Sequence, residues 1–447
     1  MIHYMKVNSL LSGLFLLALI GCAIEDETSP TPDEVFIKYY GSAGSQSLHD
    51  MVYNSDGNIV MLADQTLSDL GADANIYLVE ADTNGNAIRS NTISLNQLIY
   101  PDSAEYHTAE FPSSIVEIAT GYVIAGSYGA IIDAQIQQLQ GFWMALDNDL
   151  QVINWDTVRT GNVDLTINDA IQTSDGNVLL GGSTTAKAVN DLTPAAREQY
   201  FLIKRDFNAD TTIFRKTYGY SSSDDEVVSI FELSNGDIAL IGNTDRIGSA
   251  GGSTGKNIGI MILNPLATAQ KSAKEYGISI NGNNSADDRV VDAIQTSSGF
   301  VIVGTSELGN NERAFVLGVS TSSSLIFRST LESQWGINTN GNSVALTFQN
   351  ELFVVGSYPA YVVNDDTIDP SFRNKNAEIL AMRVDQFGTP VSGVEGNFGV
   401  ISGDDEANSV IKMPSGSLVV GATVDFGSGQ RMLALQKMND RAILQRP

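Results

Sequence analysis

The chain has 447 residues, of which 52 are acidic and 25 are basic, so its formal net charge at pH 7 is −27. Binding to the phosphates of nucleic acid requires clustered Lys and Arg, and the sequence contains no such cluster. An anionic membrane surface would repel the same charge, so we expect membrane attachment only through a covalent anchor or a partner. In other respects an acidic surface serves solubility.

We expect residues 1–21 to form a cleaved signal peptide that does not belong to the fold. Lys6 supplies a positive start, and the apolar run of residues 10–20 is too short to span a bilayer comfortably. The run ends in the sequence LIGC (residues 19–22), which resembles the lipobox of bacterial lipoproteins. Cys22 is the only cysteine, so no internal disulfide can form. We expect Cys22 to carry the lipid (palmitate) anchor; an ordinary cleaved signal with an incidental cysteine is the alternative.

Residues 22–33 are acidic and rich in Pro, Ser and Thr, a composition typical of an extended tether. The acidic run of residues 25–27 directly behind Cys22 is similar to the surface-export signal of Bacteroidota lipoproteins. This resemblance implies a protein anchored by lipid in the outer membrane, on the cell surface. The periplasmic side of the same membrane is the alternative location.

Residues 34–447 consist largely of seven copies of one degenerate pattern. Each copy has a short polar residue, an apolar strand, a Gly-centred turn, a second apolar strand, a third strand and a fourth. The clearest copies begin at Asn168, Asp224 and Asp287. A repeat of about 60 residues with several short strands is typical of a β-propeller. We therefore predict an all-β domain, a seven-bladed β-propeller with four-stranded blades.

Two of the Gly-centred turns, NSDGN at residues 54–58 and TSDGN at residues 173–177, are each followed by an apolar strand and a small residue. These segments look like the bacterial β-propeller repeats of surface and secreted proteins, and the resemblance extends over nearly all of the mature chain. It implies a fold and not an activity, so function has to be argued from a site.

One position of the repeat is occupied only by Asp or Ser. It lies seven residues before the turn glycine (Asn350 in the sixth copy), at Asp50, Ser114, Asp169, Ser229, Asp292, Ser343 and Ser409. A short acceptor at the start of the innermost strand can satisfy backbone N–H groups where the blades converge. We predict a structural role, because a catalytic role would require one copy to differ from the others.

The second strands end in a small residue, which permits close approach of another backbone. This residue is Ala63 in the first copy and then Gly126, Gly182, Gly242, Gly304, Gly356 and Gly421.

The N-terminal segment of residues 34–41 has the pattern of a fourth strand but precedes the first blade. We predict that it supplies the outer strand of the seventh blade and so closes the ring without leaving an open edge. Residues 441–444 compete for the same position.

The connections between second and third strands are long and variable, which predicts a binding face that also bears the connections between blades. We expect long loops at residues 64–75, 127–141, 183–199, 243–257 and 357–377. Aromatic side chains there can stack on sugar rings or anchor a protein partner. The candidates are Tyr100, Tyr106, Tyr128, Tyr220, Trp335, Tyr358 and Tyr361. Alternatively, each ring covers the flank of a neighbouring blade.

Catalytic and metal-binding patterns are scarce. Only His49 and His107 remain after loss of the signal, and two histidines cannot build a three-His zinc site. Neither accompanies a GxSxG motif, and there is no phosphate-binding loop of Walker type. We predict no cofactor. Three acids at the starts of first strands, Asp225, Asp288 and Asp405, lack the spacing of a Ca²⁺ loop. We expect solvated or turn-forming charges there, with Ca²⁺ binding as the alternative.

The sequence therefore favours a non-catalytic outer-membrane lipoprotein. Its propeller would bind a ligand or a protein partner. The expected location in the outer membrane implies an accessory subunit of an outer-membrane uptake or assembly complex. A carbohydrate-active enzyme that uses a pair of carboxylates is one alternative. A periplasm-facing assembly scaffold is the other.

Overall fold

The computed structural model describes most of the chain between residues 35 and 438. The described residues are 35–67, 74–101, 107–132, 135–158, 163–188, 191–219, 222–245, 255–278, 286–308, 311–331, 338–358, 377–391, 396–398, 403–427 and 430–438.

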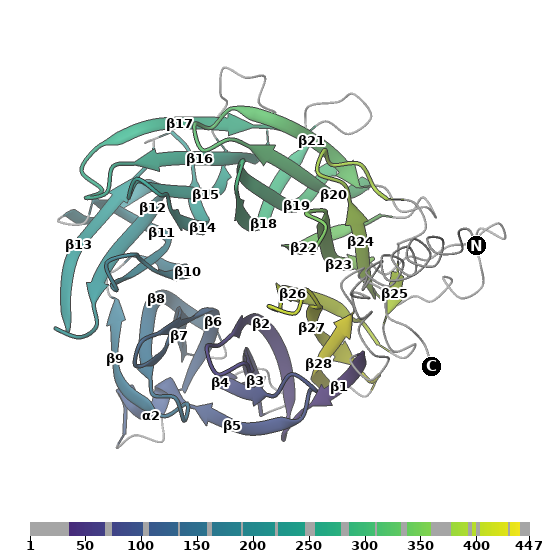
Figure 1. The fold of residues 1–447 in the computed structure, drawn as a ribbon. Helices are drawn as coiled ribbons and strands as arrows, with labels where there is room; N and C mark the ends of the chain where they lie inside the picture. Colours follow the sequence, from purple (N-terminus) through teal and green to yellow (C-terminus); the bar gives the residue numbers. More distant parts are fainter. Residues whose placement is uncertain are drawn as a thin grey trace, which may run out of the picture. The chain divides into compact units, whose positions relative to one another are not determined.

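Seven four-stranded antiparallel sheets are arranged in a ring (Figure 1), which confirms the predicted seven-bladed β-propeller. Within each blade the strands follow one another outward from the axis, because short turns can join only neighbouring antiparallel strands. The innermost strands are β2 (Ser45–Tyr53), β6 (His107–Ile118), β10 (Leu165–Gln172), β14 (Asp225–Glu232), β18 (Asp287–Thr296), β22 (Asn340–Leu346) and β26 (Glu406–Lys412).

The other strands complete the blades in the same order. The second strands are β3 (Ile59–Thr66), β7 (Gly121–Ile132), β11 (Val178–Ala188), β15 (Ile238–Thr244), β19 (Gly299–Leu308), β23 (Leu352–Tyr358) and β27 (Leu418–Asp425). The third strands are β4 (Ala74–Ala81), β8 (Gln135–Leu146), β12 (Asp191–Asp206), β16 (Asn257–Leu263), β20 (Asn311–Val319), β24 (Glu378–Val384) and β28 (Arg431–Met438). The outer strands are β5 (Ala87–Ile93), β9 (Val152–Val158), β13 (Thr211–Tyr218), β17 (Gln270–Tyr276), β21 (Leu325–Leu331), β25 (Gly396–Phe398) and β1 (Phe36–Tyr40).

The hydrophobic core lies between adjacent blades. The middle strands β15 and β16 are buried at every position, because each blade is covered on both faces by its neighbours and needs no polar side. One cluster joins Ile241 and Ile260 of blade 4 to Phe300 and Phe315 of blade 5. The outer strands alternate or are largely exposed, as in β13.

Every innermost strand contains a β-bulge. In all seven blades its pairing with the second strand skips one residue, immediately before the Asp or Ser of the repeat. We call the skipped positions the bulge residues: His49, Ser113, Asn168, Val228, Val291, Asn342 and Asn408. A bulge adds a residue to one strand and re-aims its side chains, so two consecutive side chains per blade can face the axis.

The small residue at the end of the second strand lies opposite this bulge. A Cβ on Gly242 would come within 1.8 Å of the carbonyl oxygen of Glu226, and one on Gly182 within 2.0 Å of that of Thr166. Close backbone approach was thus predicted correctly, and the bulge is its cause. The predicted position of the small residue is wrong in blade 7, where Ala422 lies opposite the bulge and not the preceding residue, Gly421.

Gly242→Ala is expected to destabilise the propeller by about 2 kcal/mol, since the new methyl group must displace the backbone of β14. Gly176→Ala provides the control, because its Cβ meets nothing within 4 Å and only the positive φ of 81° is unfavourable. Chemical denaturation of both variants measures the difference. Equal losses would show that steric conflict at the bulge is unimportant.

The N-terminal strand closes the ring as predicted. β1 pairs antiparallel with β28, from Phe36 opposite Lys437 to Tyr40 opposite Leu433. The Tyr40 hydroxyl also donates to the carbonyl of Gly85 in blade 1, at 2.7 Å. Residues 441–444 lie outside the described part of the chain.

The two faces of the propeller differ. We call the face with the β2–β3 and β4–β5 turns (residues 54–58 and 82–86) the short-turn face, and the opposite one the long-connection face.

The prediction of a long loop is wrong at two of the five places. Residues 127–141 and 183–199 extend the β7–β8 and β11–β12 ladders, to Ile132 opposite Gln135 and Ala188 opposite Asp191.

Among the described residues, no helix is long and apolar enough to cross a membrane.

Candidate functional site

A cavity of about 290 Å³ lies on the axis of the ring, among the innermost strands of all seven blades. Its wall is made of the bulge residues, the adjacent Asp or Ser residues and a few apolar neighbours. We call the Asp and Ser positions the ring residues and this space the axial cavity. A concave space lined from seven rigid strands is a candidate binding site.

The ring residues join successive blades. At five of the seven junctions the side chain of a ring residue accepts a hydrogen bond from a backbone N–H of the next blade. Asp50 accepts from Ile115 at 2.9 Å and Asp169 from Ile230 at 2.7 Å. These bonds support the predicted structural role, since they satisfy backbone donors where the strands crowd together.

The bulge residues add a second set of contacts between blades. Asn168 donates to the carbonyl of Val227 at 2.8 Å, and Asn342 donates to that of Ala407 at 2.9 Å. The side chain of Val228 has no hydrogen-bond donor. In its place, the side chain of Asn243 in β15 donates to the next blade. The wall of the axial cavity is therefore held by side-chain to backbone bonds around most of the ring.

Acidic and hydroxyl side chains alternate around the ring, in the order Asp, Ser, Asp, Ser, Asp, Ser, Ser. The three carboxylates belong to Asp50, Asp169 and Asp292, and no two of them occupy neighbouring blades. Burial, with a smaller contribution from the charges of the other ring acids, raises the pKa of Asp50 to about 7 and that of Asp169 to about 6. Burial also raises the pKa of Asp292.

Two ring hydroxyls differ from the other ring residues. Ser229 and Ser409 are only 6% and 7% exposed, line the axial cavity, and have no hydrogen-bond partner among the described residues. By contrast, Ser343 donates to Asp292 at 2.7 Å and accepts from the backbone of Val410. Because no described group engages either hydroxyl, both are available to a molecule in the cavity.

The axial cavity also has an apolar side. Five of the bulge residues are His, Ser or Asn, but those of the adjacent blades 4 and 5 are Val228 and Val291. Ile171 and Phe231 line the cavity near them. Among the described lining residues there is no Lys or Arg, so the wall combines an acidic, hydroxyl-bearing part with an apolar part.

Most of the predicted aromatic candidates are not placed at this site. Tyr106, Tyr220, Trp335 and Tyr361 lie outside the described residues, as do Cys22 and the side chain of Tyr358. Tyr128 is only 4% exposed and packs in a core cluster with Leu95 of the short helix α2 (Leu95–Ile99). Its ring is therefore not available to a partner. Tyr100 caps the C-terminus of α2 and is half-buried.

The three acids considered for Ca²⁺ are buried in three different blades. Thr244 donates to Asp225 at 2.6 Å, Ser306 donates to Asp288 at 2.6 Å, and the backbone of Asp425 donates to Asp405 at 2.9 Å. They are therefore neither solvated nor close together. Within the described ranges, no group of three or more His, Cys, Asp or Glu side chains could hold a metal ion.

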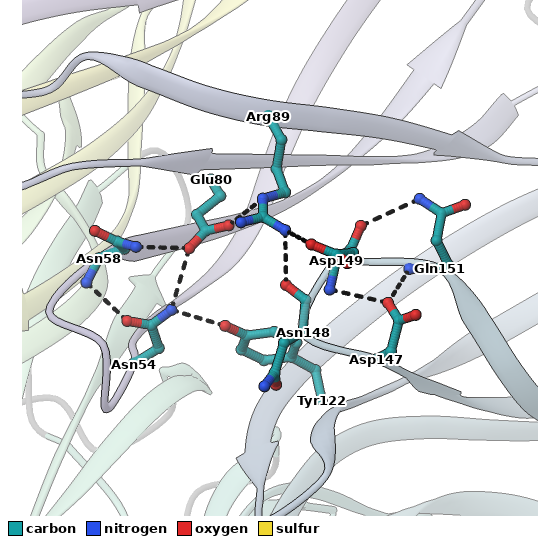
Figure 2. Close-up of polar contacts among 9 residues, drawn as sticks. All are labelled: Asn54, Asn58, Glu80, Arg89, Tyr122, Asp147, Asn148, Asp149 and Gln151. Atoms are coloured by element: carbon teal, nitrogen blue, oxygen red, sulfur yellow. Dashed lines mark hydrogen bonds and ion pairs between the residues drawn. The ribbon is translucent and has the colours of Figure 1, made fainter.

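A second polar cluster joins blades 1 and 2 on the short-turn face (Figure 2). Its centre is the buried carboxylate of Glu80, which accepts from Asn58 at 2.7 Å and pairs with Arg89 at 2.8 Å. Arg89 also donates to the carbonyl of Asn148 in blade 2 and pairs with the exposed Asp149. All these groups have partners, so the cluster is a junction between blades and not an open site.

Arg89→Ala is expected to destabilise the propeller by about 2 kcal/mol, because it leaves the buried Glu80 carboxylate without its cation. Asp149→Ala removes the exposed partner of the same arginine and is expected to cost less than about 0.5 kcal/mol. Unfolding in denaturant compares the two. A larger loss for Asp149→Ala would contradict this account of the junction.

Sequence reasoning found the ring residues but missed the bulge residues beside them. The signal was present, since each bulge residue directly precedes a ring residue, but a bulge breaks the alternation that strand reading assumes. Nothing in the sequence distinguishes the apolar pair Val228 and Val291 from ordinary strand interior. Only the ring geometry brings these two side chains to the axis.

No protein-family model matches the sequence, and no curated protein matches it significantly. Solved structures resemble the fold at low identity. A protein of unknown function from Dyadobacter fermentans is 10% identical with a TM-score of 0.48, covering 91% of this chain and 98% of that chain. The phage phi92 endosialidase is 8% identical (TM-score 0.46; 91% and 69% covered). The polysaccharide lyase Uly1 is 10% identical (TM-score 0.48; 90% and 91% covered). Similarity at this level does not extend to an activity or a site.

Proposed function

We propose that this chain is a non-catalytic binding protein of the outer membrane. A lipid on Cys22 would hold it at the cell surface, and the propeller would take a ligand or a partner protein through the axial cavity and the long-connection face. The proposed setting is an accessory subunit of an outer-membrane uptake or assembly complex.

The engagement of the cavity carboxylates supports binding over catalysis. Both oxygens of Asp50 accept backbone N–H groups, from Met51 and Ile115, and both oxygens of Asp169 do so as well, from Ala170 and Ile230. A general acid or base needs an oxygen directed at the reacting group. These carboxylates are instead fixed as acceptors in the wall, while the unpartnered hydroxyls face the cavity.

The position of β1 supports the proposed orientation. β1 begins at Phe36. The Phe36 ring lies so close to Gly85 of the β4–β5 turn that a Cβ on this glycine would touch it, so β1 begins on the short-turn face. The proposed tether therefore joins the propeller at this face, and the long-connection face is clear of the point of attachment.

Affinity capture of the native lipoprotein from gently solubilised outer membranes, followed by mass spectrometry, tests the proposal. Stoichiometric recovery of an outer-membrane protein is the expected result. Protease treatment of intact cells separates a surface position from the alternative of a periplasm-facing scaffold, which would stay protected. Recovery of the lipoprotein alone would remove the accessory role.

A carbohydrate-active enzyme is the second candidate. The observation in its favour is the raised pKa of Asp50, about 7, because a carboxyl that stays protonated near neutral pH suits a general acid. Incubation with a panel of glycans tests it. Hydrolysis by the wild-type protein that disappears in Asp50→Asn would replace the binding proposal with this one.

A further inference from the structure

We propose that the axial cavity binds a small organic cation with an apolar flank, of the alkylammonium class. This inference rests on the proposed binding function and specifies the chemistry of one ligand. It is carried by three independent properties of the cavity wall: its charge, its unpartnered hydroxyls and its apolar side.

The charge of the wall selects the sign of the ligand. Asp50, Asp169 and Asp292 line the cavity, His49 is the only other titratable side chain among the described lining residues, and no Lys or Arg accompanies them. Each carboxylate already accepts backbone N–H groups, but a carboxylate has about four lone-pair sites and can accept further donors. An anion would meet no positive partner in this space.

The hydroxyls of Ser229 and Ser409 provide the second, independent observation. Both side chains are more than nine-tenths buried, line the cavity and lack a partner among the described residues. Ser229 lies between the blades of Asp169 and Asp292, and Ser409 lies next to the blade of Asp50. An ammonium group carries three donors and no acceptor, so it can be shared between a carboxylate and a serine oxygen.

The apolar side of the wall distinguishes an organic cation from an inorganic one. Val291 is 37% exposed although it lies on an innermost strand, and Val228 occupies the same position in the adjacent blade. Asn168 and Asn342 at equivalent positions bond to the next blade, which a valine cannot do. Asn243 makes the contact to the next blade in place of Val228. Both valines therefore present methyl groups to the cavity, where an alkyl chain can cover them.

The volume of about 290 Å³ is near the lower end of the range for small-molecule pockets. It suits a compact ligand and not a polymer chain.

Three four-carbon probes and one short ammonium ion test the inference. Calorimetric titration of the full chain, in a nonionic detergent, uses n-butylammonium, n-butanol, butyrate and methylammonium. We expect n-butylammonium to bind about tenfold more tightly than methylammonium, because its three further methylene groups are covered by the apolar side. Butanol is expected to bind at least about tenfold more weakly than n-butylammonium, since it lacks the charge, and butyrate is expected not to bind.

Variants locate the site. Ser229→Ala removes a hydroxyl that has no hydrogen-bond partner among the described residues. The variant is expected to weaken n-butylammonium binding about fivefold without loss of stability. Val291→Ser should reduce the preference for n-butylammonium over methylammonium. Asp169→Asn should weaken both ammonium ions about tenfold or more. Asp56→Asn, in the exposed β2–β3 turn, makes the same change of charge away from the cavity and should leave binding unchanged.

Equal binding of butyrate and n-butylammonium would overturn the inference, as would n-butylammonium binding that Ser229→Ala and Asp169→Asn leave unchanged. Complete competition by millimolar CaCl₂ would replace the organic cation with an inorganic one. Failure here is distinguishable from failure of the proposed function. If an outer-membrane partner is captured but n-butylammonium does not bind, the proposed binding function is supported and only the cation site is contradicted. Glycan hydrolysis that depends on Asp50 would contradict the proposed binding function, independently of the result with the four probes.

Discussion

Removal of residues Glu34–Gly41, with the signal, Cys22 and the tether kept, is expected to lower the free energy of unfolding by about 4 kcal/mol. The deletion takes β1 out of the seventh sheet and exposes the ladder edge of β28. It also removes Tyr40, which is buried and bonds to Gly85. Since an unpaired edge promotes pairing with other chains, aggregation on heating is expected as well.

Single substitutions separate the causes of this loss. Tyr40→Ala is expected to cost about 3 kcal/mol, because a large buried ring and its hydrogen bond disappear. Ile37→Ala in the same strand is expected to cost less than about 0.5 kcal/mol, since Ile37 is exposed. Denaturant unfolding followed by circular dichroism measures all three variants. If the deletion leaves the unfolding midpoint unchanged, β1 does not close the ring.

The propeller is expected to be more stable at pH 5.5 than at pH 8, by about 3 kcal/mol. The folded pKa of Asp50 is raised to about 7 and that of Asp169 to about 6, whereas an unfolded Asp titrates near 4. Between pH 4 and pH 7 the folded chain therefore binds more protons than the unfolded chain. The free energy of unfolding falls as the pH rises through this window, and Asp50 alone accounts for about 2 kcal/mol of the difference.

Acids with lowered pKa values act in the opposite direction, but outside this window. Hydrogen bonds, first among them that from Lys204, outweigh burial and lower the pKa of Asp175. Its stabilising contribution is lost only as the pH falls below the range of an ordinary Asp. The difference between pH 5.5 and pH 8 therefore reports mainly the raised acids.

The variant Asp50→Asn isolates the contribution of the Asp50 carboxyl to the pH dependence of the free energy of unfolding. Asparagine does not titrate, so we expect the variant to lose about 2 kcal/mol of the difference between the two pH values, whatever its absolute stability. Asp56→Asn changes the net charge equally but removes an exposed carboxyl, and it should retain the wild-type dependence. Parallel pH curves for the wild type and Asp50→Asn would contradict a raised pKa at the ring.

The blades could be predicted because their signals are local. Glycine turns such as that at Gly57, apolar strands and the Asp or Ser of the ring recur at fixed spacing, and residues 34–41 repeat the pattern of a fourth strand. Each of these features depends on a short stretch of chain. The number of blades, their four strands and the closure of the ring therefore followed from the sequence, and the structure confirms them.

What could not be predicted depends on pairing between distant residues. The sequence pattern predicts the end of the second strand at Gly126, but this residue lies opposite a bulge and β7 continues to Ile132. The sequence predicts the small residue of blade 7 at Gly421, since glycine holds this place in most copies, but the pairing puts Ala422 opposite Ala407. The axial cavity itself exists only when seven bulges converge, which no single repeat encodes.

The direction of β1 has a mechanical consequence. In the proposed anchoring, any force on the lipid reaches the propeller at Phe36, the first residue of the strand that closes the ring. A pull away from the short-turn face acts along β1 and loads its pairs with β28, from Phe36 opposite Lys437 to Tyr40 opposite Leu433, together in shear. Such a pull would have to break these hydrogen bonds at once and not one after another. The strand that closes the ring would thus also bear the tension between membrane and propeller.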